Sequence, residues 1–121
     1  MRIEQVPLMT DLAPMLHRQR LVIEGTCPRP IDDVSISRYL RELSDVCDMV
    51  SLIEPVTHRS DRFGWAGWIH WETSGAHFYA WERPLIFFSV DIYTCKPFED
   101  AAAIEFTERF FEADRIVARP F

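Results

Sequence analysis

The chain has 121 residues, and its 19 acidic and 13 basic side chains give a formal net charge of −6 at neutral pH. This length suits one domain with a substantial core, because a chain of this size buries roughly two thirds of its surface on folding. The acidic charge, and the lack of a basic run interleaved with aromatic residues, disfavour binding to nucleic acid or to an anionic membrane surface. We therefore expect a small molecule or another protein as the partner.

The cysteine content and the apolar runs bear on the compartment. Cys27, Cys47 and Cys95 are odd in number and lack the paired spacing of a zinc site, and no charged-then-apolar signal segment begins the sequence. No apolar run approaches the roughly 20 residues that span a bilayer. The sequence therefore predicts a soluble protein of the reducing cytoplasm, with no membrane partner and no metal.

The N-terminal residues are predicted to lie outside the domain. Residues 1–18 contain Pro7 and Pro14 and show no sustained periodicity. We expect an arm there that packs on the domain or on a neighbouring subunit. Residues 19–121 are expected to form the domain itself.

The first half of the domain is predicted to contain a strand, a helix and a second strand. The first strand alternates apolar and polar side chains and has Glu24 in its middle. The helix follows Asp32 and Asp33, which are good N-cap candidates, and carries an apolar stripe. Pro55 interrupts the second strand and indicates an edge position or a bend. The predicted ranges are residues 20–26, 32–47 and 49–57.

The centre of the chain is predicted to contain two adjacent strands. Strict alternation along the first, which begins at residue 64, places His70, Glu72 and Ser74 on one face. Along the second, from residue 86, apolar side chains suited to a core alternate with polar ones that include Asp91 and Cys95. The polar faces of the two strands are expected to meet.

A helix over residues 97–113 and a short strand over residues 115–119 complete the predicted elements. Pro97 suits the first turn of that helix, and acidic side chains follow it. The resulting order, β-α-β-β-β-α-β, predicts an α+β fold, a two-layer α/β sandwich. Its sheet is expected to be mainly antiparallel, with both helices on one face and the other face open for a partner.

The central strands also resemble a known family. Residues 90–95, VDIYTC, are similar to the signature V-D-x-F-T-C-G of the bacterial S-adenosylmethionine decarboxylases, which are small pyruvoyl enzymes. A second signature, S-G-x-x-x-x-x-E-S-H-x-x-I-H-T-W-P-E, aligns without a gap to Gly67, Ser74 and Trp81. The resemblance covers about residues 18–119. It implies the α/β sandwich of that family and a homodimer with sites at or near the subunit interface.

The resemblance also implies an activity and roles for two residues. Ser74 falls on the serine that self-cleaves to generate the pyruvoyl group, the electron sink of the decarboxylation. Cys95 falls on the cysteine that donates a proton after carbon dioxide has left. The implied enzyme acts on adenosylmethionine or another amino-acid-like amine, with a pyruvoyl cofactor only if the chain cleaves between Thr73 and Ser74.

Several positions depart from the self-cleavage motif. Thr73 replaces the glutamate before the serine, Tyr79 replaces a histidine that assists processing, and Ala66 replaces a serine implicated in the same step. Gly75 replaces the histidine that follows the serine. Because self-cleavage needs a proton shuttle and a stabilised oxyanion, these departures predict that it is severely slowed.

Other polar residues of the central strands support an alternative. His70 is a plausible general base near neutral pH, and Glu72 could orient it or carry a proton itself. The alternative is an unprocessed, pyruvoyl-independent relative that uses this acid-base pair, or a non-catalytic binding or regulatory homologue. Activation of Cys95 by His70 is a further option. The candidate catalytic residues are Ser74, Cys95, His70 and Glu72, and the candidate substrate-binding residues are Glu24, His77, Tyr79 and Asp91.

Overall fold

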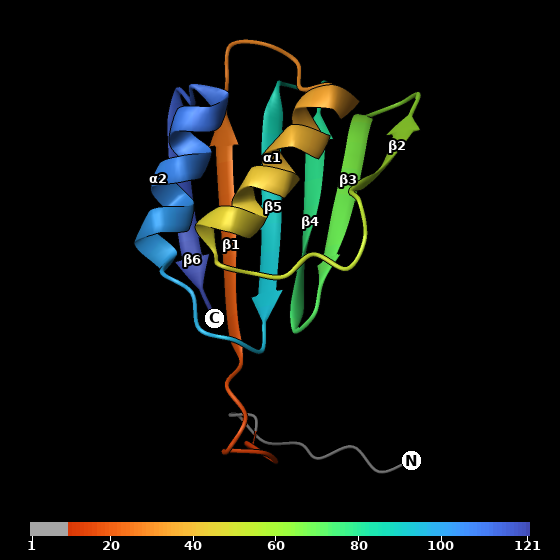
Figure 1. The fold of residues 1–121 in the computed structure, drawn as a ribbon. Coiled ribbons are helices and arrows are strands. Elements are labelled where there is room, and N and C mark those ends of the chain that lie inside the picture. Colours follow the sequence, from red (N-terminus) through yellow and green to blue (C-terminus); the bar gives the residue numbers. More distant parts are fainter. Residues whose placement is uncertain (1–9) are drawn as a thin grey trace.

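A computed structural model describes residues 10–121; the first half of the predicted arm, residues 1–9, lies outside the described residues. Figure 1 shows one antiparallel sheet with two helices packed on the same face. The strands lie in the order β2-β3-β4-β5-β1-β6, and every neighbouring pair is antiparallel. The predicted two-layer α+β sandwich is therefore confirmed. The elements are β1 (Gln19–Thr26), α1 (Asp33–Val46), β2 (Val56–Ser60), β3 (Gly64–Trp71), β4 (Ser74–Trp81), β5 (Phe87–Thr94), α2 (Asp100–Phe111) and β6 (Arg115–Pro120).

The predicted order of elements is wrong by one strand. The strand predicted from residue 64 to about Ser74 ends at Trp71, and Ser74 begins a further strand, β4, so the order is β-α-β-β-β-β-α-β. Glu72 and Thr73 form the two-residue loop of this β3–β4 hairpin, and Trp71 pairs with Ser74 across it. A two-residue loop is the common connection between antiparallel neighbours. The hairpin supplies the sixth strand of the sheet.

Two other boundaries also differ from the prediction. β2 begins at Val56, directly after Pro55, while the predicted start of that strand forms only an isolated bridge between Ser51 and Trp71. Pro55 has no N–H to donate to a ladder, so regular pairing starts after it. α2 begins three residues later than expected, since Gln19 exchanges hydrogen bonds with the backbone of Phe98 and holds the preceding loop open.

The core lies between the sheet and the two helices and is rich in aromatic rings. Tyr39 on α1 is fully buried, packs against Phe78 of β4 and Phe111 of α2, and shares a 2.7 Å hydrogen bond with Thr107. Burial raises the pKa of the Tyr39 hydroxyl well above its usual range. This cluster fixes both helices to the centre of the sheet.

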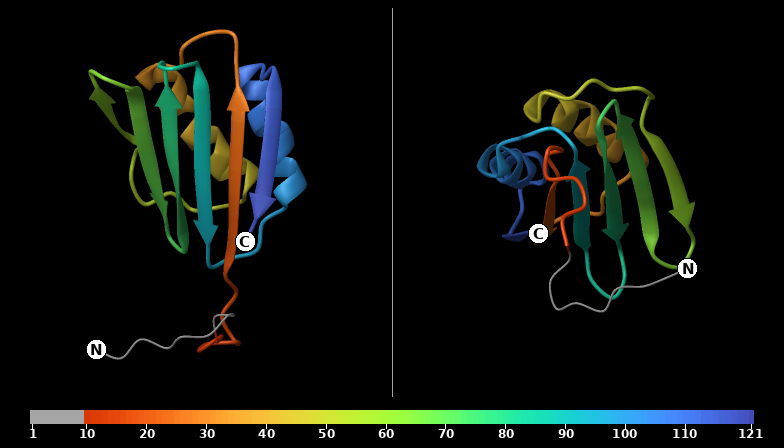
Figure 2. Two further views of the ribbon diagram at one scale, coloured as in Figure 1. Left: turned by 180° about the vertical axis from the view of Figure 1, so that it is seen from behind. Right: turned by 90° about the horizontal axis from the view of Figure 1, so that it is seen from below.

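The opposite face of the sheet is uncovered, as the left view in Figure 2 shows. The register brings Trp68, His77 and Asp91 into one row across β3, β4 and β5 on that face. His70 and Tyr79 stand on the same face, each two residues farther along its strand, on opposite sides of this row. The open face is therefore the side on which most of the candidate residues stand.

In the described part of the chain no helix is long and apolar enough to cross a membrane.

Candidate functional site

A groove at one end of the sheet gathers most of the candidate residues. It has a volume of about 710 Å³ and lies where the β3–β4 hairpin loop meets the end of β5. Tyr79 and Glu24 stand on the open face outside the groove. Six of the eight candidates line it: His70, Glu72, Ser74, His77, Asp91 and Cys95.

The prediction that Ser74 shares a face with His70 is wrong. Residues paired across an antiparallel hairpin point to the same face, and the partner of Ser74 is Trp71, which is fully buried in the core. Ser74 is accordingly only 7% exposed, whereas His70 is exposed on the open face. The groove is thus lined from two sides: His70 belongs to the open face, and Ser74 reaches the groove from the core side at the end of the sheet.

Ser74 and Cys95 are joined through one backbone N–H. The amide of Cys95 donates to the carbonyl oxygen of Thr73 at 3.0 Å and to Ser74 Oγ at 3.3 Å. The hydroxyls of Thr73 and Ser74 are 2.9 Å apart. A donor aimed at a carbonyl oxygen stabilises negative charge that develops there, which is the task of an oxyanion hole. The Ser74 hydroxyl and the carbonyl that precedes it are therefore held together, with a donor in place on the carbonyl.

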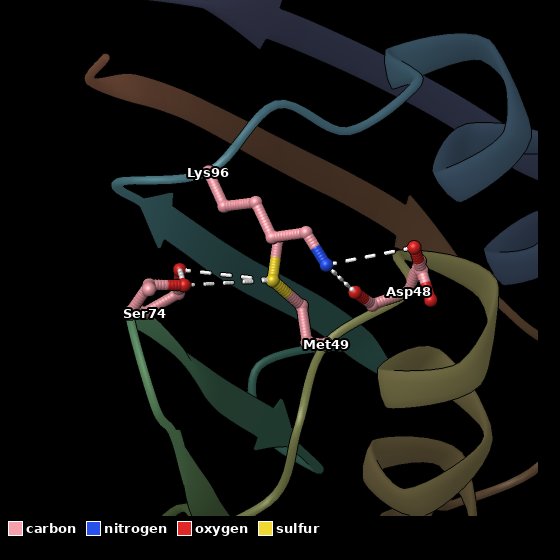
Figure 3. Close-up of polar contacts among 5 residues, drawn as sticks. Asp48, Met49, Ser74 and Lys96 are labelled. Carbon is pink, nitrogen blue, oxygen red and sulfur yellow. Dashed lines mark hydrogen bonds and ion pairs between the residues drawn. The ribbon is translucent and has the colours of Figure 1, made fainter. Parts of the chain in front are cut away.

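On the core side, the Ser74 hydroxyl faces a thioether. Figure 3 shows Ser74 directed at Met49, and the Ser74 hydroxyl donates to Met49 Sδ at 3.8 Å. Thr73 Oγ1 makes a similar contact at 3.9 Å. Among residues 10–121, no titratable side chain is within hydrogen-bond distance of Ser74 Oγ. A thioether is only a weak acceptor and cannot take the hydroxyl proton.

His70 lies across a glycine on the neighbouring strand. Gly75 pairs with His70 in the register, and a Cβ built on Gly75 would be 3.9 Å from His70 Nδ1 and 3.0 Å from the Ile69 carbonyl oxygen. The contact with the Ile69 carbonyl oxygen is tight, whereas the contact with the imidazole is an ordinary van der Waals one. Glycine therefore suits position 75 mainly because the neighbouring backbone is close.

All four predicted binding residues already have hydrogen-bond partners within the chain. Asp91 accepts two hydrogen bonds of 2.9 Å from Arg20, which raise the pKa of the Arg20 guanidinium. His77 Nδ1 lies 3.1 Å from the Tyr79 hydroxyl. Glu24 accepts from Ser89 Oγ at 2.8 Å. Of the acidic groups that line the groove, Asp91 is paired with a cation, and the exposed Glu72 has no ion pair among the described residues.

Comparison with known proteins places the chain in a family. Residues 23–121 match the family model described as S-adenosylmethionine decarboxylase. The chain belongs to this family. Its fold is similar to that of the crystal structure of the adenosylmethionine decarboxylase from Aquifex aeolicus, with a TM-score of 0.72 and 13% sequence identity over 86% of this chain and 88% of that one. Comparison with curated proteins gave no match.

The contacts around the groove include residues that the sequence reasoning missed. Met49 contacts the Ser74 hydroxyl and Arg20 binds Asp91, and neither was singled out. Opposite charges on two paired strands can indicate such an ion pair, but the pairing of β1 with β5 was not predicted. No signal in the sequence indicated Met49, because it lies in the irregular segment between α1 and β2 and meets Ser74 only through the tertiary fold.

Proposed function

We propose that this S-adenosylmethionine decarboxylase family member decarboxylates a small amino-acid-like amine, with adenosylmethionine as the first candidate, and that its pyruvoyl group derives from Ser74. The observation that carries the proposal is the shared N–H of Cys95, which contacts both the Ser74 hydroxyl and the Thr73 carbonyl. These are the nucleophile and the electrophile of self-cleavage. The fold supports the same conclusion, because the groove opens beside that peptide bond.

The residues fit the chemistry that generates the group. Ser74 Oγ would attack the Thr73 carbonyl carbon, so that a C–O bond forms, the C–N bond to Ser74 breaks, and an ester replaces the peptide bond. The Cys95 N–H would stabilise the oxyanion on Thr73 during this step. Elimination across Cα and Cβ of Ser74 then frees the Thr73 carboxylate, and hydrolysis of the remaining enamine releases ammonia. A pyruvoyl group at position 74 supplies a carbonyl that withdraws electrons from a bound amino acid.

The remaining groove residues suit a cationic amine. Glu72 stands exposed in the hairpin loop at the groove and offers a carboxylate to a positively charged substrate. Cys95 is exposed at the same groove, where its thiol can hold a proton for the product carbon. His70 lines the same groove and is the side chain proposed to exchange that proton.

The open face supports a homodimer. Trp68, Tyr79 and Tyr93 stand exposed on a sheet face that no helix covers in the single chain. A second copy packed there would bury these aromatic rings, which are enriched at protein interfaces. Analytical ultracentrifugation tests this point: a monomer across the micromolar range would contradict it, and a dimer that Tyr79→Glu dissociates would support it.

The intact mass of freshly purified protein tests the proposed activity. We expect two fragments, the second starting at position 74 and lighter by one ammonia than a fragment with an N-terminal serine. Ser74→Ala should give one full-length mass. Release of carbon dioxide from adenosylmethionine, and from simpler amino acids with a side-chain cation, would then identify the substrate. A single full-length mass for both proteins would refute the proposal.

One observation favours a second candidate function. Because the described residues place no base at Ser74, the chain could remain intact and use the exposed His70 and Glu72 for proton transfer. This candidate expects a full-length mass together with turnover that His70→Gln and Glu72→Gln each reduce. A full-length mass with ligand binding and no turnover would instead indicate a regulatory homologue.

A further inference from the structure

Lys96 is the only lysine in the chain, which otherwise carries 12 arginines as its basic residues. It follows Cys95 directly, at the position where the resembled signature ends in glycine. The two residue types differ in chemistry: an arginine guanidinium stays protonated in proteins, whereas a lysine amine can give up and regain a proton. Among the lysine and arginine side chains, the one able to do this lies beside the candidate cleavage site.

Lys96 lies in the bend that follows β5, close to Ser74. Ser74 pairs with Thr94, the last residue of β5, and both are buried on the core side. Lys96 comes two residues after Thr94, and the amide of the intervening Cys95 touches Ser74 Oγ at 3.3 Å. The end of β5 thereby brings Lys96 next to the site of Ser74.

The present contacts of Lys96 confirm this placement. Lys96 Nζ donates to the carbonyl oxygen of Asp48 at 2.5 Å, and the next residue, Met49, accepts from the Ser74 hydroxyl (Figure 3). Lys96 and Ser74 therefore contact consecutive residues of one segment. The five bonds of the lysine stem span about 6 Å, and the Lys96 Cα lies only one peptide unit beyond the N–H that touches Ser74. The side chain of Lys96 is therefore long enough for Nζ to reach Ser74.

The ion pair with Asp48 does not prevent the Lys96 side chain from turning toward Ser74. The two charged groups are 3.5 Å apart, and the Asp48 side chain is 97% exposed. Exposed pairs of this kind contribute at most about 1 kcal/mol. The amine can leave Asp48 and return without a large change in free energy.

We propose that Lys96 is the proton shuttle of Ser74 self-cleavage, an inference that rests on the proposed function. Ser74 Oγ forms a bond to the Thr73 carbonyl carbon. As it does so, the Lys96 ammonium gives one proton to the departing Ser74 nitrogen, and the resulting amine takes the hydroxyl proton of Ser74. The charge on Lys96 is the same before and after the step, and the net result is the transfer of one proton from Oγ to N. Lys96 thereby supplies the proton transfer that Met49 cannot provide.

A purely structural role would be different. Lys96 also binds a carbonyl just beyond the C-terminal end of α1, where a cation is favourable. Lys96→Arg keeps the cation and its donors but cannot exchange a proton, whereas Lys96→Gln removes the charge. A matched control is Arg29→Gln, which breaks the exposed Arg29–Glu112 pair at the opposite end of the sheet.

The experiment follows cleavage over time after cell-free synthesis of the four full-length proteins, by intact mass. Hydroxylamine is added to a parallel sample, because it cleaves an ester at Thr73–Ser74 and so detects the first step alone. We expect wild type and Arg29→Gln to cleave at the same rate, and both Lys96 variants to cleave at least about 100-fold more slowly, as for loss of a general acid-base group. Thermal unfolding should show that Lys96→Arg stays as stable as wild type.

The other outcomes are each decisive. Cleavage of both Lys96 variants at the wild-type rate would overturn the role of Lys96 and leave the proposed function standing. Wild-type rates in Lys96→Arg alone would show that charge suffices, which also overturns proton transfer by Lys96. A wild-type protein that stays intact with and without hydroxylamine would overturn both proposals together.

Discussion

Ser44 on α1 is the hydrogen-bond acceptor that ties the helix to the hairpin of the site. The indole N–H of Trp71 donates to Ser44 Oγ at 2.7 Å, and Trp71 is fully buried in the core. The same hydroxyl donates to the Leu40 carbonyl at 2.8 Å and accepts from Ser51 at 3.2 Å. Trp71 is the last residue of β3, directly before the loop that leads to Ser74. We expect Ser44→Ala to destabilise the fold at this point.

The magnitude follows from the partner left behind. A buried donor without an acceptor costs about 1–3 kcal/mol, and here both Trp71 and Ser44 are buried, so solvent does not reach the indole N–H. Alanine has the higher helix propensity and removes the back-bond to Leu40, which offsets about 0.5 kcal/mol of that loss. The expected decrease in the free energy of unfolding is therefore about 1–2 kcal/mol.

Urea denaturation followed by tryptophan fluorescence measures this difference. Ser51→Ala is the matched control, because it removes a hydroxyl of the same network whose own residue is exposed, and it should change the free energy of unfolding by less than about 0.5 kcal/mol. Trp71→Phe removes the unpaired donor, so Ser44→Ala should cost less in that background. Equal effects of the two serine substitutions would refute the reasoning.

Further predictions concern the N-cap, the helix–sheet contact and the thiols. Asp32→Ala should lower the free energy of unfolding by about 1 kcal/mol through loss of the N-cap bond to α1, measured in urea at pH 7. Hydrogen bonds from the helix start lower the pKa of Asp32 below its usual 3.8. The stabilisation by the Asp32 carboxylate should therefore be present above pH 3.8 and be lost as the pH falls below it. In urea titrations, the difference in the free energy of unfolding between wild type and Asp32→Asn should accordingly be smaller at pH 3 than at pH 6. Gly67→Ala should cost about 1–3 kcal/mol in thermal or urea unfolding, because the new Cβ would lie 2.7 Å from Ile36 Cγ2, and this cost should be smaller in an Ile36→Ala background, which lacks Cγ2. Burial raises the pKa of the Cys47 thiol to about 12, so at pH 8 a disulfide reagent should modify the exposed Cys95 quickly and Cys47 only after unfolding.

The fold could be predicted largely because apolar periodicity and capping residues report local geometry directly. Asp32 caps α1 as predicted, with its side chain accepting from the Ser35 amide at 2.9 Å. The alternation along β5 is also confirmed, since Phe88, Val90 and Ile92 are fully buried. Each of these signals depends on neighbours within one element, and such signals survive in the folded chain.

The hairpin was missed because its loop has no turn signal. Glu72 and Thr73 replace the Asn-Gly or Asp-Gly pair that marks a two-residue turn, and polar residues continue to alternate through it. Length was the available clue, because the strand predicted from residue 64 to about Ser74 is longer than the usual strand of about 5–6 residues. This one error also put Ser74 on the wrong face: positions three apart oppose each other along a strand, but Trp71 and Ser74 face the same way as a pair across a hairpin.

The position of the hairpin loop explains how one site can use residues from both faces of a sheet. In the middle of the sheet, a core-facing serine and an open-face histidine would be separated by the backbone layer itself. At the loop that layer ends, so Ser74 and His70 both line the same groove although they belong to opposite faces. The two faces offer different chemistry there, since Ser74 meets the buried Met49 while His70 stays exposed. We therefore expect His70→Gln to leave the cleavage rate at Thr73–Ser74 within about threefold of wild type, because no open-face side chain among residues 10–121 touches the Ser74 hydroxyl. The same substitution should lower the turnover of bound amine by about 10²-fold. Equal losses in both steps, measured by intact mass and by carbon dioxide release, would show that the two faces do not work separately.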